Sequence, residues 1–133
     1  MLRVLLLVSL FLVISCKHQH GESTSPLYKE VMAIHDAVMP EMATIHQLKK
    51  ELKAIKTPAS NDIILDQIKS LDDSDEAMMS WMAAFKIPED KTKEIPYLES
   101  EKVKIQQVSD KMFAAMKAAA STIDSLKSIK TEQ

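Results

Sequence analysis

Methionine and histidine residues are the side chains of this sequence with the plainest capacity for ligand chemistry. They recur at helical spacing in two stretches of the chain, as His35, Met39, Met42, Met78, Met79 and Met82. Thioether sulfur and imidazole nitrogen form a soft ligand set that suits monovalent copper. If the two stretches are antiparallel helices, we expect these residues at one level of the fold. Two interpretations are open. The residues form a copper-binding site, or the methionines fill irregular gaps in a hydrophobic core.

A second group is polar and falls on positions that an apolar pattern would otherwise occupy. Its members are Glu41, His46, Asp72 and Asp75. Buried carboxylates are costly unless they are paired or protonated. One interpretation is a carboxylate–His site for zinc or iron, although the Glu-x-x-His spacing of di-iron bundles is absent. The interpretation we favour is a polar layer that sets the register of the helices, with Lys49 or Lys50 nearby.

Residue patterns that signal catalysis are missing. The chain has one cysteine and no serine in a strand-turn-helix elbow motif. His35 and Asp36 are adjacent, so on a helix they point about 100° apart and are not expected to pair easily. We therefore expect no enzymatic activity.

The first long element is predicted over residues 27–56. Apolar residues alternate at spacings of four and three, which is a heptad pattern with Glu41 as its one polar member. The positions are Leu27, Val31, Ile34, Val38, Glu41, Ile45, Leu48, Leu52 and Ile55. Pro40 removes one backbone hydrogen bond in the middle. Because the pattern keeps its phase across Pro40, we expect a kink and not an end.

Two further helices are predicted over residues 62–85 and 97–130. The first has Asp75 as its one polar heptad member and carries Ile64, Ile68, Leu71, Met78, Met82 and Phe85. The second carries Leu98, Glu101, Ile105, Val108, Met112, Ala115, Ala119, Thr122, Leu126 and Ile129. The connections are short, so the sequence predicts an all-α, antiparallel three-helix bundle (up-down-up) over residues 27–133.

Composition supports this fold and limits the partners. The only glycine is Gly21, which excludes a Gly-rich phosphate loop, and helix-forming residues are abundant. Arg3 is the only arginine and the net charge is −2. Once residues 1–15 are removed, no arginine remains, and because arginine is the residue that binds phosphate in a bidentate manner, nucleic acid is not an expected partner.

The first fifteen residues have the features of a secretory signal peptide. Arg3 gives a positive start, Val4 to Ile14 is an apolar run interrupted only by Ser9, and Ser15 is small. The apolar run is shorter than the roughly 20 residues that a transmembrane helix needs. We therefore expect residues 1–15 to be removed and not to serve as a permanent anchor.

The four residues Val13-Ile14-Ser15-Cys16 resemble a bacterial lipobox, the aliphatic-x-small-Cys motif of lipoproteins. The resemblance implies diacylation of the Cys16 thiol, cleavage after Ser15 and acylation of the new amino terminus. Multiple acyl chains, palmitate for example, give a stable membrane anchor. Residues 16–26 would then be the lipidated cysteine and a flexible linker. The linker lacks an acidic cluster after the cysteine, which favours the periplasmic face of the outer membrane.

Two longer stretches are similar to a group of small lipoproteins from Bacteroidota-type bacteria, some of which are labelled "viral A-type inclusion protein". They are residues 28–42 (YKEVMAIHDAVMPEM) and 71–82 (LDDSDEAMMSWM). The resemblance implies the same location in the cell envelope and the same helical fold. It supplies no activity and no catalytic residues.

Together these features predict a membrane-anchored envelope lipoprotein whose helical bundle is a binding or scaffolding module for an envelope protein. The expected contact surface is an exposed apolar or acidic area around Trp81 and residues 72–76. The alternative function is binding or buffering of copper by the Met and His residues.

Overall fold

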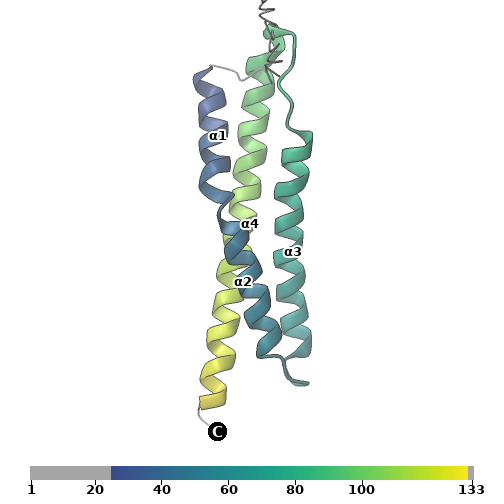
Figure 1. The fold of residues 1–133 in the computed structure, drawn as a ribbon, viewed down its shortest axis with the longest axis vertical. Helices are drawn as coiled ribbons and strands as arrows, with labels where there is room; N and C mark the ends of the chain where they lie inside the picture. The colour runs from purple at the N-terminus through teal and green to yellow at the C-terminus, as the bar shows by residue number, and fades with distance from the viewer. Residues whose placement is uncertain (1–24, 132–133) are drawn as a thin grey trace, which may run out of the picture.

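The computed structural model describes residues 25–131, and within this range the chain is helical without a strand. Its elements are α1 (Pro26–Val38), α2 (Glu41–Ala54), α3 (Asn61–Ala84), a short 3-10 turn η1 (Lys91–Lys93) and α4 (Glu94–Thr131). Figure 1 shows α1 and α2 running in one direction, α3 returning beside α2, and α4 running back along all three. The predicted all-helical bundle is confirmed. None of the helices over residues 25–131 is long and apolar enough to cross a membrane.

The α1–α2 arm is interrupted where the sequence predicts a kink. Met39 and Pro40 keep right-handed helical torsion angles, and the Met39 amide still donates to the His35 carbonyl at 2.8 Å. Pro40 has no amide proton, so the next hydrogen bond of the series is lost. The structure therefore divides the predicted helix over residues 27–56 into two, without shifting the phase of its apolar face.

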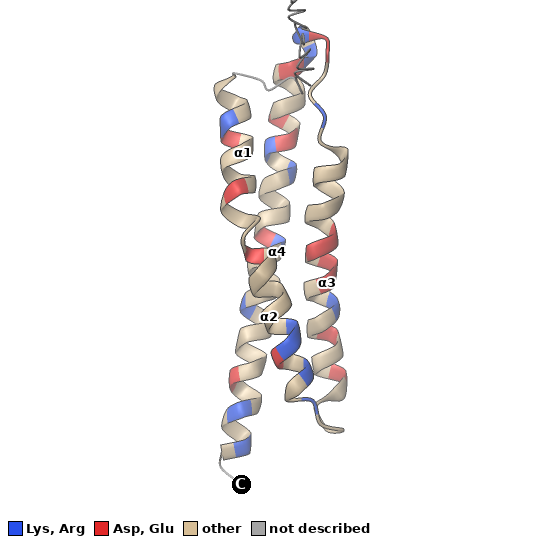
Figure 2. Ribbon diagram, in the orientation of Figure 1, with Lys and Arg blue, Asp and Glu red and all other residues tan. Residues whose placement is uncertain are grey.

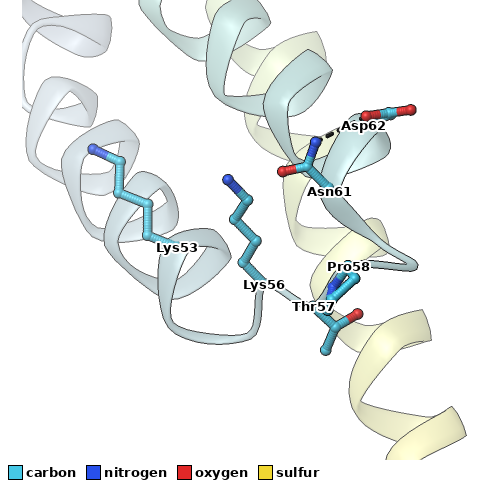
Figure 3. A pocket seen from close by; sticks show the side chains of 6 residues that line it. All are labelled: Lys53, Lys56, Thr57, Pro58, Asn61 and Asp62. Carbon is cyan, nitrogen blue, oxygen red and sulfur yellow. Dashed lines mark hydrogen bonds between the residues drawn. The ribbon is translucent and has the colours of Figure 1, made fainter.

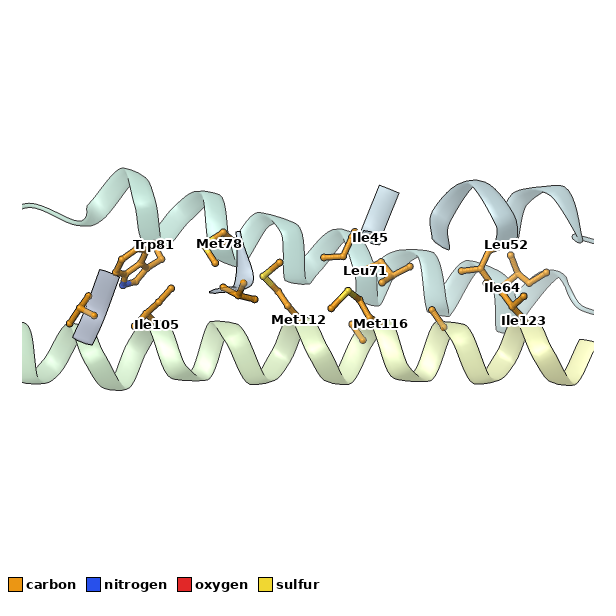
Figure 4. Packing of buried hydrophobic residues seen from close by; sticks show 14 of the residues in the cluster. Ile45, Leu52, Ile64, Leu71, Met78, Trp81, Ile105, Met112, Met116 and Ile123 are labelled. Atoms are coloured by element: carbon orange, nitrogen blue, oxygen red, sulfur yellow. The ribbon is translucent and has the colours of Figure 1, made fainter. Parts of the chain in front are cut away.

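The hydrophobic core follows the predicted heptads closely. On the α1–α2 arm, Val31, Val38, Ile45 and Leu52 are seven residues apart and fully buried. Ile64, Leu71 and Met78 on α3 repeat the same interval and the same burial. Figure 4 shows Ile64, Leu71 and Met78 meeting side chains of α4, which are Ile123, Met116 and Met112. A seven-residue interval keeps one face of each helix toward its neighbours, which is why this core is continuous along the bundle.

α3 is one helix, as predicted, and its acidic run at residues 72–76 does not break it. Its apolar face departs from the prediction at the upper end. Met82, predicted as a core residue, is 38% exposed, whereas Trp81 is buried to 7% exposure. α4 packs against both α1 and α3 in this part of the bundle, and α1 lies mainly against α4. The buried face of α3 is therefore turned toward α4, which favours position 81 over position 82.

α4 is the longest helix and contacts every other helix. Ala115 and Ala119 are buried among larger residues, and these small side chains let the neighbouring helices approach closely. Ile129 was predicted to be a core position, but it is 55% exposed. Figure 1 accounts for this difference, because the last part of α4 extends beyond the turn between α2 and α3, where no other helix of residues 25–131 lies beside it.

Ion pairs between helices agree with the parallel course of α4 and the α1–α2 arm. Lys102 pairs with Glu30, and Lys127 pairs with Glu51 at 3.2 Å. On the other side of α4, the Lys111 ammonium donates to the Asp73 carbonyl at 2.7 Å. Figure 2 shows acidic and basic side chains interspersed along α4. Such exposed pairs contribute little stability each, so they favour one register without holding the bundle together.

Candidate functional site

The six predicted soft-metal ligands do not share one environment. Met78 is fully buried in the core, whereas Met79 is 51% and Met82 is 38% exposed. Met39 and Met42 are partly buried against the core, and the His35 side chain is 14% exposed. Met78 and Met79 are neighbours on one helix and point about 100° apart. The structure thus separates Met79 from the bundle interior, whereas Met39 packs against the core and His35 is largely shielded from solvent.

His35 is fixed by two contacts. Its Nδ1 lies 2.8 Å from the Asp36 carboxylate, so the expectation that these adjacent residues would not pair is wrong. Its ring centroid is 5.7 Å from that of Trp81 on α3. The short side chain of Asp36, 71% exposed, bends back to reach the imidazole. These contacts leave the imidazole oriented between α1 and α3.

Trp81 belongs to an aromatic cluster at the end of the bundle where α1 begins. Its ring centroid is 4.8 Å from that of Phe85, which in turn is 6.3 Å from Tyr28 and 5.9 Å from Tyr97. Offset and tilted ring pairs of this kind stabilise beyond their buried area. The cluster joins α1, α3 and α4. Trp81 is therefore a core residue and cannot be part of the predicted exposed surface, whereas Met79, Met82 and Asp72 near it are exposed.

Two polar atoms of the aromatic cluster behave differently. The Lys86 amide donates to the Tyr97 hydroxyl at 2.7 Å, and burial raises the pKa of this phenol above its ordinary value of 10.0. The phenol thus stays neutral at physiological pH. The Trp81 Nε1–H, by contrast, is buried and has no hydrogen-bond partner. Figure 4 shows Trp81 between α3 and α4, near Ile105. A buried indole donor usually has a partner, so this one is unusual.

The predicted polar layer forms around a lysine. The Lys49 ammonium donates to Asp72 at 2.7 Å and lies 3.9 Å from Asp75. The His46 Nε2 is 4.0 Å from the same Asp75 oxygen. Glu41 lies in the first turn of α2 and takes no part in these contacts. The layer thus joins α2 to α3 through three of its four predicted members, with Lys49 as the cation.

The zinc or iron interpretation of this layer finds no matching geometry. Over residues 25–131, no three His, Cys, Asp or Glu side chains are grouped so that they could hold a metal ion. The acidic run at residues 72–76 is largely paired with lysines, because Asp73 also binds Lys69. The contacts are those of a register-setting layer.

Replacing Lys49 tests the polar layer. Its side chain is 14% exposed, and Asp75 already has one buried carboxylate oxygen without a hydrogen-bond partner. We expect Lys49→Ala to lower the free energy of unfolding by about 1–2 kcal/mol, between the values for exposed and buried pairs. The matched control is the adjacent and exposed Lys50→Ala, measured in the same urea titration. Equal losses in the two variants would show that the layer contributes nothing specific.

A shallow, open hollow lies at the turn between α2 and α3. Its lining residues are Lys53, Lys56, Thr57, Pro58, Asn61 and Asp62. Figure 3 shows the two lysine side chains beside the start of α3, where the Asn61 amide binds the Asp62 carboxylate. Exposed lysines of this kind attract anions weakly, and salt screens the attraction.

Cys16, the predicted lipidation site, lies outside the described residues, as do the predicted signal peptide and most of the linker. A scan against protein-family models, a search of curated proteins and a search of solved structures each give no match for this chain. The functional argument therefore rests on the residues themselves.

Proposed function

We propose that this chain is a lipid-anchored lipoprotein of the bacterial envelope, without enzymatic activity, whose bundle binds or scaffolds an envelope protein. The observation that carries the proposal is the sequence Val13-Ile14-Ser15-Cys16, which follows an apolar run too short to span a bilayer. Acylation of Cys16 would attach the protein to the membrane. The anchor is on the periplasmic face of the outer membrane, because the residues after Cys16 lack an acidic cluster.

The shape of the bundle suits a role at a distance from the membrane. α1 begins at one end of the bundle, ten residues after Cys16, and the turn between α2 and α3 lies at the other end (Figure 1). At 1.5 Å per residue, the 38-residue helix α4 is about 57 Å long. An anchored bundle of this length presents its helical sides and its far end to other envelope proteins.

Several large apolar side chains on α3 and α4 are exposed and available for such contacts. They are Ile63, Leu65, Met79, Met82, Ile95, Val103, Phe113 and Ile129. Single exposed apolar residues are common on protein surfaces, so their number alone does not identify an interface. Their distribution over two helices favours a partner that lies along the bundle.

Protease accessibility and photo-crosslinking test the location and the binding role together. We expect external protease to spare the protein in intact cells and to degrade it once the outer membrane is permeabilised. A photoreactive residue at Met79 or Val103 should give a discrete crosslinked species, with the exposed Lys69 position as the control. Degradation in intact cells would contradict the periplasmic location. Absence of a discrete species from every apolar position would contradict the scaffolding role.

A second candidate function, soft-metal binding or buffering, is favoured by one observation. The contact between His35 and Trp81 sets a potential nitrogen ligand of α1 level with the methionine-rich part of α3.

A further inference from the structure

The imidazole of His35 is held in a state that suits a metal ligand. A carboxylate only accepts hydrogen bonds, so the Nδ1 that lies 2.8 Å from Asp36 must carry the proton. The lone pair of the neutral ring is then on Nε2. Metal-binding histidines are commonly oriented by a carboxylate in this way. Most of the imidazole is shielded from water, with the side chain 14% exposed.

Two methionines fall, by helical position, on the sides of the α1–α2 arm and of α3 that face each other near His35. Met39 directly follows α1 in helical conformation, four residues after His35 and on the same face, and it packs against the core. Met82 lies seven residues after Asp75, which contacts His46 and Lys49 of α2, so it falls on the side of α3 that faces the α1–α2 arm, and it is 38% exposed. Met82 therefore stands at the border between the buried side of α3 and the solvent. One nitrogen and two sulfurs are thus available where α1 faces α3.

Trp81 supplies an independent sign that this place is unusual. Its ring centroid is 5.7 Å from that of His35, and its buried Nε1–H has no partner. The face of an indole attracts cations within about 6 Å of its centre. Packing of the core alone does not require a buried tryptophan with an unpaired N–H beside an oriented histidine. The combination therefore favours a ligand-binding role for this place.

We propose that His35, Met39 and Met82 form a binding site for monovalent copper, with the indole of Trp81 beside the metal. Two thioethers and one imidazole are soft ligands, which select Cu(I) over magnesium or calcium. Met78 is excluded because it is fully buried in the core, and Met79 because it is half-exposed and lies about 160° around α3 from Trp81. The site is independent of the anchor, so it stands or falls separately from lipidation.

A competition titration tests the site directly. The sample is the full chain in detergent with Cys16→Ala, because a free thiol would itself bind Cu(I). Cu(I) is added under reducing conditions against a chromophoric chelator. We expect one equivalent to be taken from the chelator. Because Trp81 is the only tryptophan, we expect its fluorescence to be quenched in parallel.

Three variants and one control locate the ligands. Met39→Leu and Met82→Leu nearly conserve volume, so the bundle should keep its fold while Cu(I) binding and quenching are lost. Asp36→Asn should weaken binding about tenfold, because it removes the group that orients His35. Met79→Leu is the matched control on α3 and should bind like the parent chain. Circular dichroism confirms that each variant is folded.

Three results would overturn the proposal. One is failure of the parent chain to compete with the chelator. Another is uptake of Cu(I) without any change in Trp81 fluorescence, which would place the metal elsewhere. The third is equal binding by the Met82→Leu and Met79→Leu variants. In each case the methionines of this region would be ordinary packing residues, and the proposal of a lipid anchor would be unaffected.

Discussion

Leu71→Ala should lower the free energy of unfolding by about 2–5 kcal/mol, the usual range for emptying a buried leucine site. Leu71 is fully buried on α3 and belongs to the single core that joins all the helices. The loss combines the transfer of apolar surface to water with the cavity that remains, because helices held by a continuous core relax only partly around it. A urea titration followed by circular dichroism measures this change.

The matched control for this prediction is Leu65→Ala. It makes the same substitution on the same helix, but Leu65 is 47% exposed. We expect a change within about 0.5 kcal/mol, as for other surface positions. Similar losses in the two variants would mean that the face of α3 carrying Leu71 is not the face that the other helices cover.

Ala119→Leu should also destabilise the bundle, by about 1–3 kcal/mol, through overpacking. Ala119 is fully buried on α4, the helix that contacts all the others. A larger side chain there must push α4 away from its neighbours or adopt a strained rotamer. The expected result is a lower urea midpoint with the helical signal retained at low denaturant.

Ala118→Leu is the control for overpacking, since residue 118 is exposed and carries the same side chain one position earlier. Leucine and alanine are both good helix formers, so the effect on helix propensity is small in either variant. We expect Ala118→Leu to be nearly neutral. A neutral Ala119→Leu would show that the close approach of the helices at this level is absent.

The heptad pattern was sufficient to predict the core. Along most of the bundle, the seven-residue spacing of the apolar side chains determines which of them are buried. Val31, Val38, Ile45 and Leu52 share one face of a helix whatever its neighbours are, and all four are buried. The same reasoning predicted that the phase would continue across Pro40. The division into α1 and α2 depends on local hydrogen bonding at one proline, which a periodic pattern does not describe.

The candidate site was less predictable because it depends on how helices sit against one another. Met82 and Trp81 are adjacent, and the sequence pattern placed Met82 in the core. The structure buries Trp81, whose side chain lies between α3 and α4 (Figure 4). The pairing of His35 with Asp36 depends on side-chain rotamers, which spacing does not specify. Sequence thus indicated the residue types of the site, but not that Trp81 and Asp36 would be the residues in contact with His35.

Lipidation of Cys16 is the central claim, and metabolic labelling with a palmitate analogue tests it most directly. We predict that the wild-type protein carries the label and is recovered with the membrane fraction. Cys16→Ala should carry no label and should not be processed after Ser15. The substitution is outside residues 25–131, so the bundle should fold equally well in both proteins. A wild-type protein without label, or label that persists in Cys16→Ala, would contradict the account.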